Sequence, residues 1–130
     1  MMTDLSLISG RFVICRLPAG DPVPASMRAC AFVSITRTAD ELSIVCDEAS
    51  APEGARIEAG WSLLKVKGPI DFSAVGVVAS LASPIADAGI GIFVISTFDT
   101  DYLLVKATDL VAAADALERA GHSVDTGGTG

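Results

Sequence analysis

Two short polar segments of the sequence carry the carboxylates and hydroxyls best placed for chemistry. The first, GPIDFSAVGV at residues 68–77, brings Asp71 to the expected start of a helix. The second, STFDTD at residues 96–101, joins two apolar runs and contains Asp99 and Asp101. Free N–H groups at a helix start can receive a carboxylate, and the carboxylates of the second segment suit an ammonium or guanidinium group.

Each segment also has a purely structural interpretation. In the first, Asp71 or Ser73 caps a helix and Gly76 permits close packing. In the second, Asp and Thr residues favour the turn conformations of a simple hairpin. The residues of either segment alone leave both interpretations open.

The chain shows no pattern of residues typical of catalysis or of metal binding. It has no GxSxG, HExxH or complete phosphate loop, and His122 is the only histidine. The cysteines at positions 15, 30 and 46 form no CxxC pair, and each stands in an apolar stretch. We therefore expect no enzyme, no cofactor and no metal, and we expect the cysteines to be buried thiols of a reducing, cytoplasmic compartment.

Composition excludes several classes of protein. Of the 130 residues, 51% are hydrophobic and 19% are charged, which is too apolar for a disordered chain. The net charge of −7 repels phosphate backbones, so nucleic acid is not an expected partner. The longest apolar run, residues 88–95, is too short to span a bilayer, and the N-terminus lacks the features of a signal peptide.

The second half of the chain has the periodicity of a ferredoxin-like α+β unit. Apolar residues at three- and four-residue spacing predict helices at 73–88 and 109–120, with Gly89 and Gly121 at their ends. Apolar runs predict strands at 61–68, 90–96 and 102–106 and a short one at 122–126. The order is βαββαβ. Because the first helix carries almost no charge, we expect an oligomer, most simply a homodimer.

The first half resembles the front of the same unit. Strands are predicted at 10–17, 30–38 and 42–48, and the Ala- and Gly-rich stretch 50–60 is the best candidate for a linker. FVSITRTADELSIV and FVISTFDTDYLLV share a strand–turn–strand pattern. We therefore predict a tandem arrangement, with a truncated domain at 1–58, a complete domain at 59–126 and a disordered tail at 127–130.

The predicted topology separates the two polar segments. We expect the first and third strands of the complete domain to be adjacent and parallel, which puts the loop after the first strand and the 96–101 turn at opposite edges of the sheet. The two segments of one subunit are then not expected to meet. A site made of both would need a second copy or the other half of the chain.

The stretch WSLLKVKGPIDFSAVGVVASLASPIADAGIGIFVISTFDTDYLLVKATDL resembles an ACT domain of the aspartokinase-like subtype. Small bacterial two-ACT proteins and the arginine-sensing CASTOR proteins share the STFxTDYLLV string. Asp71 matches the acidic residue of the ACT signature, Gly76 and Val77 match its Gly-Val, and residues 85–90 match the helix exit. Val75 stands where the signature has proline.

This resemblance implies a non-catalytic regulatory protein that binds an amino acid at an interface between ACT units. An interaction module with a vestigial pocket is the alternative. The implied ligand-binding residues come from both polar segments: Asp71, Val75, Gly76, Val77, Ile95, Ser96, Thr97, Phe98 and Asp101.

Overall fold

The computed structural model describes residues 2–71 and 74–127, which divide into two compact units. The N-terminal unit is Gly10–Trp61, and the C-terminal unit contains the residues up to Ser9 together with those from Ser62 onward. The predicted boundary after residue 58 therefore falls inside a strand, and residues 2–9 belong to the unit formed mainly by the second half of the chain.

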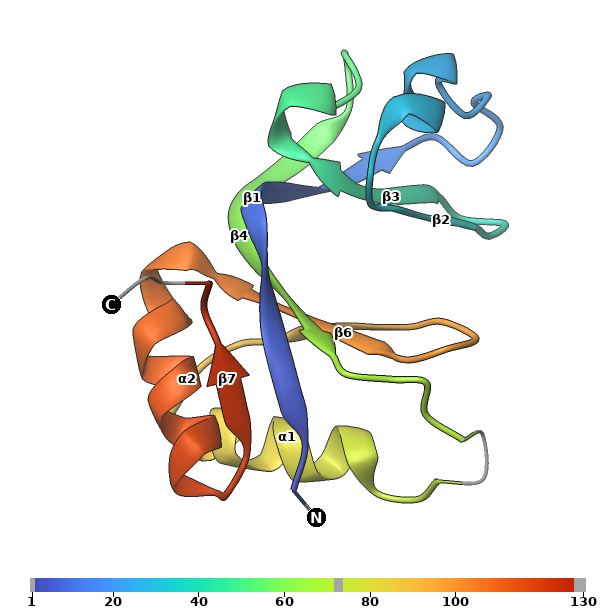
Figure 1. The fold of residues 1–130 in the computed structure, drawn as a ribbon. Helices are drawn as coiled ribbons and strands as arrows, with labels where there is room; N and C mark the ends of the chain where they lie inside the picture. The colour runs from blue at the N-terminus through green and yellow to red at the C-terminus, as the bar shows by residue number, and fades with distance from the viewer. Residues whose placement is uncertain (1, 72–73, 128–130) are drawn as a thin grey trace. The chain divides into compact units, whose positions relative to one another are not determined.

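The C-terminal unit has the βαββαβ order that the sequence predicts (Figure 1). The first part of a further strand, β1 (Asp4–Leu17), joins its sheet, which has the strand order β7-β1-β4-β6-β5. The strands β5 and β6 are antiparallel, with Ser96 opposite Asp101. The elements are β4 (Arg56–Val66), α1 (Val77–Asp87), β5 (Phe93–Ser96), β6 (Asp101–Lys106), α2 (Leu110–Arg119) and β7 (Ser123–Asp125), with a short 3-10 helix, η3 (Ala107–Asp109), before α2.

Both helices pack on one face of this sheet through a single apolar core. Leu81 and Ile85 of α1 are fully buried, as the helical spacing predicts, and so is Leu117 of α2. They contact strand residues that alternate along the chain and so share a face, and the buried members of the cluster are Leu5, Leu64, Val66, Leu81, Ile85, Leu103 and Leu117.

The strand β1 (Asp4–Leu17) is longer than the predicted strand at 10–17. Its first residues pair in parallel with β7, where Asp4 lies opposite Ser123. The strand β4 also starts earlier than predicted, at Arg56, so the expected linker at 50–60 is partly strand. Local composition did not reveal these extensions because they depend on pairing between residues far apart in the sequence.

The helix α1 begins at Val77, so the prediction of a start near Ser73 was wrong, and Asp71 does not cap the helix. Gly76 occupies the N-cap position in a left-handed conformation, with φ of 82°. Ser73 lies outside the described residues. At the other end, Gly89 has φ of 77° and Ile90 N–H bonds to Ile85 O, which confirms the glycine end of the helix.

The N-terminal unit contains the second part of β1, then η1 (Ala25–Ala29), β2 (Val33–Arg37), β3 (Leu42–Asp47) and η2 (Glu48–Ser50). Its strand order is β2-β3-β1-β4, with β3 antiparallel to both neighbours for which the register is known, β1 and β2. Cys15 and Cys46 lie in its core, as predicted, whereas Cys30 is only half-buried. That this unit is a truncated copy of the other stays a prediction.

Three further predictions concern the C-terminal tail, membrane-spanning helices and metal sites. The expected disordered tail at 127–130 lies, except for Gly127, outside the described residues. Within the described ranges, no helix is long and apolar enough to cross a membrane. The same ranges contain no group of three or more His, Cys, Asp or Glu side chains arranged to hold a metal ion.

Candidate functional site

The chain leaves β4 at Val66 and reaches α1 through an extended loop. Ala74 N–H bonds to Asp71 O at 2.9 Å. Because Gly76 adopts a left-handed φ, the helix cannot start before it. The N-cap residue Gly76 has no side chain and so supplies no hydrogen bond to the N–H groups of this helix start. The start of α1 is therefore suited to a carboxylate supplied from outside the chain.

The 96–101 turn is closed by its own side chains. Thr97 N–H donates to Thr100 O at 2.8 Å, and the Thr97 hydroxyl accepts the N–H of Thr100 at 3.3 Å. The Ser96 hydroxyl donates to Oδ1 of Asp101 at 2.5 Å, across the last pair of the β5–β6 ladder. The hairpin interpretation of STFDTD is thus correct as far as its backbone is concerned.

The turn also contacts the loop after β4 within one subunit, and the expectation that the two segments would not meet was wrong. Ile70 N–H donates to Asp99 O at 2.6 Å, and the Thr100 hydroxyl donates to Val66 O at 2.7 Å. The start of β6 therefore lies against the end of β4, so these adjacent strands are antiparallel. In an antiparallel pair, the C-terminal end of one strand lies beside the N-terminal end of its neighbour.

A pocket of about 360 Å³ lies between the two segments. This volume falls in the range of small-molecule sites, which begins at roughly 300 Å³. One wall is the loop and first turn of α1, and the other is the turn between β5 and β6. The pocket is lined by Ile70, Asp71, Ala74, Gly76, Val77, Val78, Ala79, Ser96, Thr97, Phe98, Asp99, Thr100 and Asp101.

Most of the predicted site residues are brought together here. Asp71, Gly76, Val77, Ser96, Thr97, Phe98 and Asp101 line the pocket. Val75 is outside the lining and 83% exposed, and Ile95 is also outside it, in β5. The residues implied by the family resemblance do not include Asp99 and Thr100, although the sequence indicates that the Asp99 carboxylate suits a cation. Their spacing alone does not tell which side chains of the turn face the loop.

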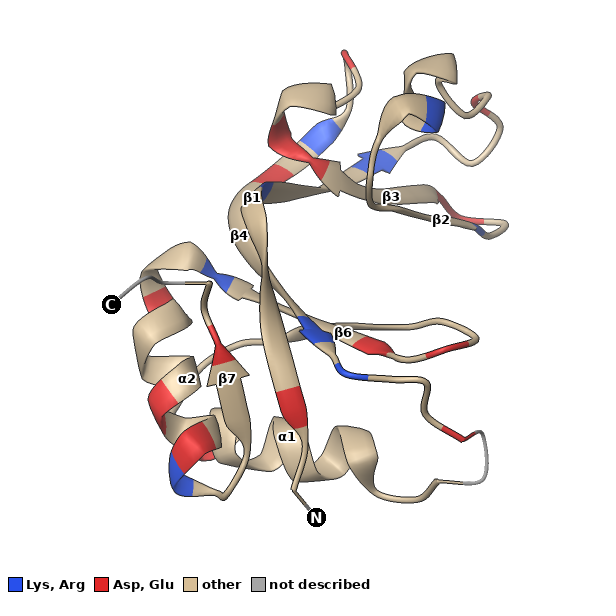
Figure 2. Ribbon diagram, in the orientation of Figure 1, with Lys and Arg blue, Asp and Glu red and all other residues tan. Residues whose placement is uncertain are grey.

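The charges of the lining are all negative. Asp71, Asp99 and Asp101 contribute carboxylates, and the described lining has no Lys, Arg or His. Figure 2 shows acidic positions on both the turn and the loop before α1. The opposing polarity comes from α1, whose N-terminus carries a partial positive charge. The pocket therefore offers acceptors for a cation and backbone donors for an anion.

The model of the ACT domain family matches residues 56–119, and a second model, of an N-terminal domain, matches residues 10–54. This chain is an ACT-domain protein. The crystal structure of protein Atu0741 from Agrobacterium tumefaciens resembles this ACT-domain protein with a TM-score of 0.89 and 48% sequence identity. The match covers 95% of this chain and 92% of that one.

Two further comparisons place the ACT-domain protein in the aspartokinase- and CASTOR-like type. The human protein named "Cytosolic arginine sensor for mTORC1 subunit 1" is 35% identical over 60 residues, which cover 45% of this chain and 18% of that protein. The ligand-free regulatory subunit of aspartate kinase from Thermus thermophilus shares the fold, with a TM-score of 0.63 at 14% identity over 90% of this chain and 96% of that one. The chain spans 60% or less of the curated relatives it matches.

Proposed function

We propose that this ACT-domain protein is a non-catalytic regulator that binds a free amino acid in the pocket between the loop before α1 and the 96–101 turn. The observation that carries the proposal is the convergence, in one subunit, of a helix start without a side-chain cap and a group of carboxylates. An α-amino acid bears a carboxylate and an ammonium group, so it matches both halves of this arrangement. The family supports the same function.

The helix start would bind the carboxylate of the ligand. The lining includes Gly76, Val77 and Val78, whose N–H groups lie in the first turn of α1 or just before it. Such N–H groups and the helix dipole together favour an anion. The ammonium group would lie toward Asp71 and Asp101, since an ionised carboxylate carries a negative charge and acts only as a hydrogen-bond acceptor.

The charge of the pocket favours an amino acid with a cationic side chain. The α-ammonium group of the ligand meets three lining aspartates, so a second cationic group on the ligand would be a favourable charge partner for them. The guanidinium of arginine or the second ammonium of lysine would supply that partner, whereas aspartate or glutamate would add repulsion. We therefore expect arginine or lysine to bind more tightly than neutral amino acids, and acidic amino acids to bind least.

A second copy of the chain would cover the open side of the pocket. Phe98, on the pocket wall, is 79% exposed, and Val75 beside the other wall is also largely exposed. Large apolar side chains exposed next to one another often mark an interface. We propose a homodimer in which these residues contact the partner.

The same two side chains favour a second candidate function. If the exposed apolar residues bind a protein and the pocket holds nothing, the chain is an interaction module with a vestigial site. This alternative makes a different prediction, because assembly would then be independent of any amino acid.

A thermal-shift screen of the wild-type protein against the twenty proteinogenic amino acids tests the proposal. A ligand at 100 times its dissociation constant adds about 2.7 kcal/mol to the free energy of unfolding. For a chain of this size that raises the melting temperature by roughly 5–12 °C. Arginine or lysine should give the largest shift. If no amino acid shifts the melting temperature of an intact dimer, the interaction module is the better account.

A further inference from the structure

Thr100 lies in an exposed turn, yet its side chain is only 4% exposed. Its hydroxyl donates to Val66 O at 2.7 Å, and this bond is buried. The carbonyl belongs to the last residue of β4, so the bond joins the turn to the start of the loop that forms the opposite wall of the pocket. Removing the donor from a buried carbonyl costs free energy of folding, so this hydrogen bond helps to hold the turn in place.

Gly68 meets the turn at the same place. A Cβ atom at Gly68 would lie 3.0 Å from Asp99 O and 3.0 Å from Thr100 Cβ. Its backbone φ is not in the left-handed region, so this close approach, and not backbone strain, is what a side chain would disturb. Two residues further on, the bond from Ile70 N–H to Asp99 O depends on the same closeness.

We propose that Thr100 and Gly68 are positioning residues of the amino-acid pocket, an inference that rests on the proposed function. They hold the turn against the loop, and this contact fixes the separation between the carboxylates of the turn and the helix start. A ligand that must reach both walls loses contact with one of them when the turn moves away. Thr100 lines the pocket but acts through the position of Asp99 and Asp101.

Two substitutions distinguish the hydrogen bond of Thr100 from the packing of its side chain. Valine at position 100 keeps the shape of the side chain but cannot donate to Val66 O, whereas serine keeps the hydroxyl and loses only a methyl group. If the hydrogen bond positions the turn, Thr100→Ser should behave like the wild type and Thr100→Val should not. A role in packing alone predicts the reverse order.

The test measures binding of L-arginine, L-lysine and the best of the remaining amino acids by calorimetry, and amide hydrogen exchange at Ile70 without any amino acid. Thr100→Val and Gly68→Ala should weaken binding at least tenfold, equivalent to about 1.4 kcal/mol, and should speed exchange at Ile70. Thr100→Ser should have the ligand affinity and the Ile70 exchange rate of the wild type. The matched controls are Thr36→Val, at an exposed strand position, and Gly91→Ala, where a Cβ atom meets nothing within 4 Å.

The outcomes separate this inference from the function on which it rests. If the wild type binds no amino acid, the proposed function fails and the positioning role falls with it. If the wild type binds an amino acid and Thr100→Val binds it equally well with unchanged Ile70 exchange, the function stands and the positioning role is rejected. Equal loss of binding in Thr100→Ser and Thr100→Val would also reject it, because the hydroxyl would then be irrelevant.

Discussion

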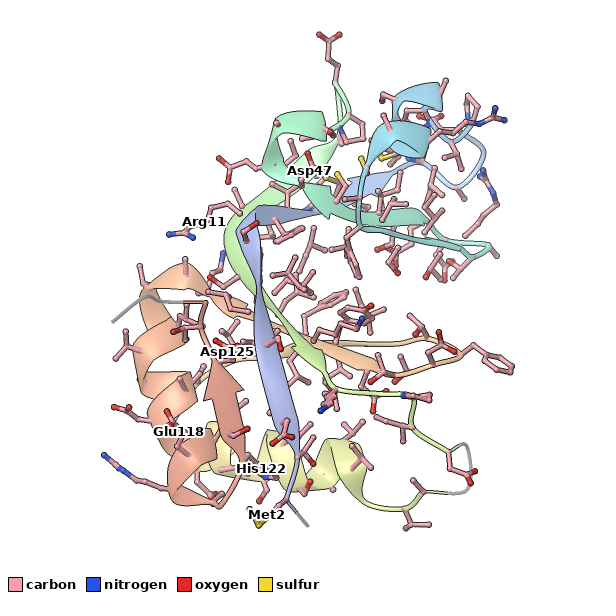
Figure 3. All side chains as sticks on the ribbon, in the orientation of Figure 1. Met2, Arg11, Asp47, Glu118, His122 and Asp125 are labelled. Atoms are coloured by element: carbon pink, nitrogen blue, oxygen red, sulfur yellow. The ribbon has the colours of Figure 1, made fainter. Side chains whose placement is uncertain are left out.

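The backbone N–H of Thr3 donates to Nδ1 of His122 at 3.1 Å, which joins the two ends of the C-terminal unit across 119 residues of sequence. The other ring nitrogen, Nε2, lies 3.0 Å from Ser80 O in α1. Since Nδ1 accepts, the neutral tautomer with a proton on Nε2 fits both contacts. Figure 3 shows His122 beside the N-terminal end of β1. This lone histidine is thus a structural residue, 5% exposed.

Replacement of His122 by alanine should lower the free energy of unfolding by about 2–4 kcal/mol, because it empties a buried site and leaves Thr3 N–H and Ser80 O without their partner. Urea denaturation measures this change. His122→Gln should recover part of the loss, since an amide can both accept and donate. A loss below about 0.5 kcal/mol for the alanine variant would show that the histidine does not join these elements.

At Gly76, substitution by alanine should lower the free energy of unfolding by about 1–2 kcal/mol, because the residue has φ of 82°. A Cβ atom there meets nothing within 4 Å, so the cost comes from the backbone. Gly91→Ala is the matched control, as its site is equally open and its φ is not left-handed. Thermal melting of both variants should separate them, and equal melting temperatures would contradict the left-handed start of α1.

The thiol of Cys46 should make the protein less stable in alkaline solution. Burial, reinforced by the neighbouring Cys15, raises its pKa from 9.0 to about 12 in the folded state. Between these values the unfolded chain binds fewer protons than the folded one, so the free energy of unfolding falls as the pH rises. Cys46→Ala should remove part of this slope in urea midpoints measured from about pH 8 to about pH 10. Parallel slopes for the two proteins would contradict the raised pKa.

Phe98→Asp should convert the proposed homodimer into a monomer. A charge at this exposed apolar position would have to be desolvated in the interface, which costs several kcal/mol. Light scattering at high micromolar protein compares the variant with the monomer mass of 13.3 kDa. The control is Val111→Asp, whose side chain is also largely exposed but lies in α2, away from the pocket. A monomer mass for the wild type would contradict the proposed interface.

Local patterns predicted the elements of the C-terminal unit well, because the helices and strands there follow simple periodicities. Leu81 and Ile85 stand at helical spacing and are fully buried, and the glycines at 89 and 121 end their helices. The strand formed by residues 4–9 was missed. Its partner β7 lies at the other end of the chain, and only the folded sheet reveals that pairing.

The candidate site was predicted in composition but not in geometry. The residues of GPIDFSAVGV and STFDTD were identified from their types, and most of them line one pocket. The two segments meet within one subunit because β4 and β6 are antiparallel. Parallel strands, as expected from the sequence, would have kept the segments apart. Thr100 was not singled out because its burial arises from contact with Val66, a residue 34 positions earlier.

The central claim is that the turn and the helix start bind one amino acid together, and calorimetry with L-arginine and L-lysine on the wild type and on Asp101→Asn tests it most directly. Asparagine can still accept the hydroxyl of Ser96, so the hairpin should stay folded while the charge is lost. The expected result is one amino acid bound per chain, with affinity at least tenfold lower in the variant, or about 1.4 kcal/mol. Equal affinity in the two proteins, or no heat of binding from the wild type with any amino acid, would contradict the claim.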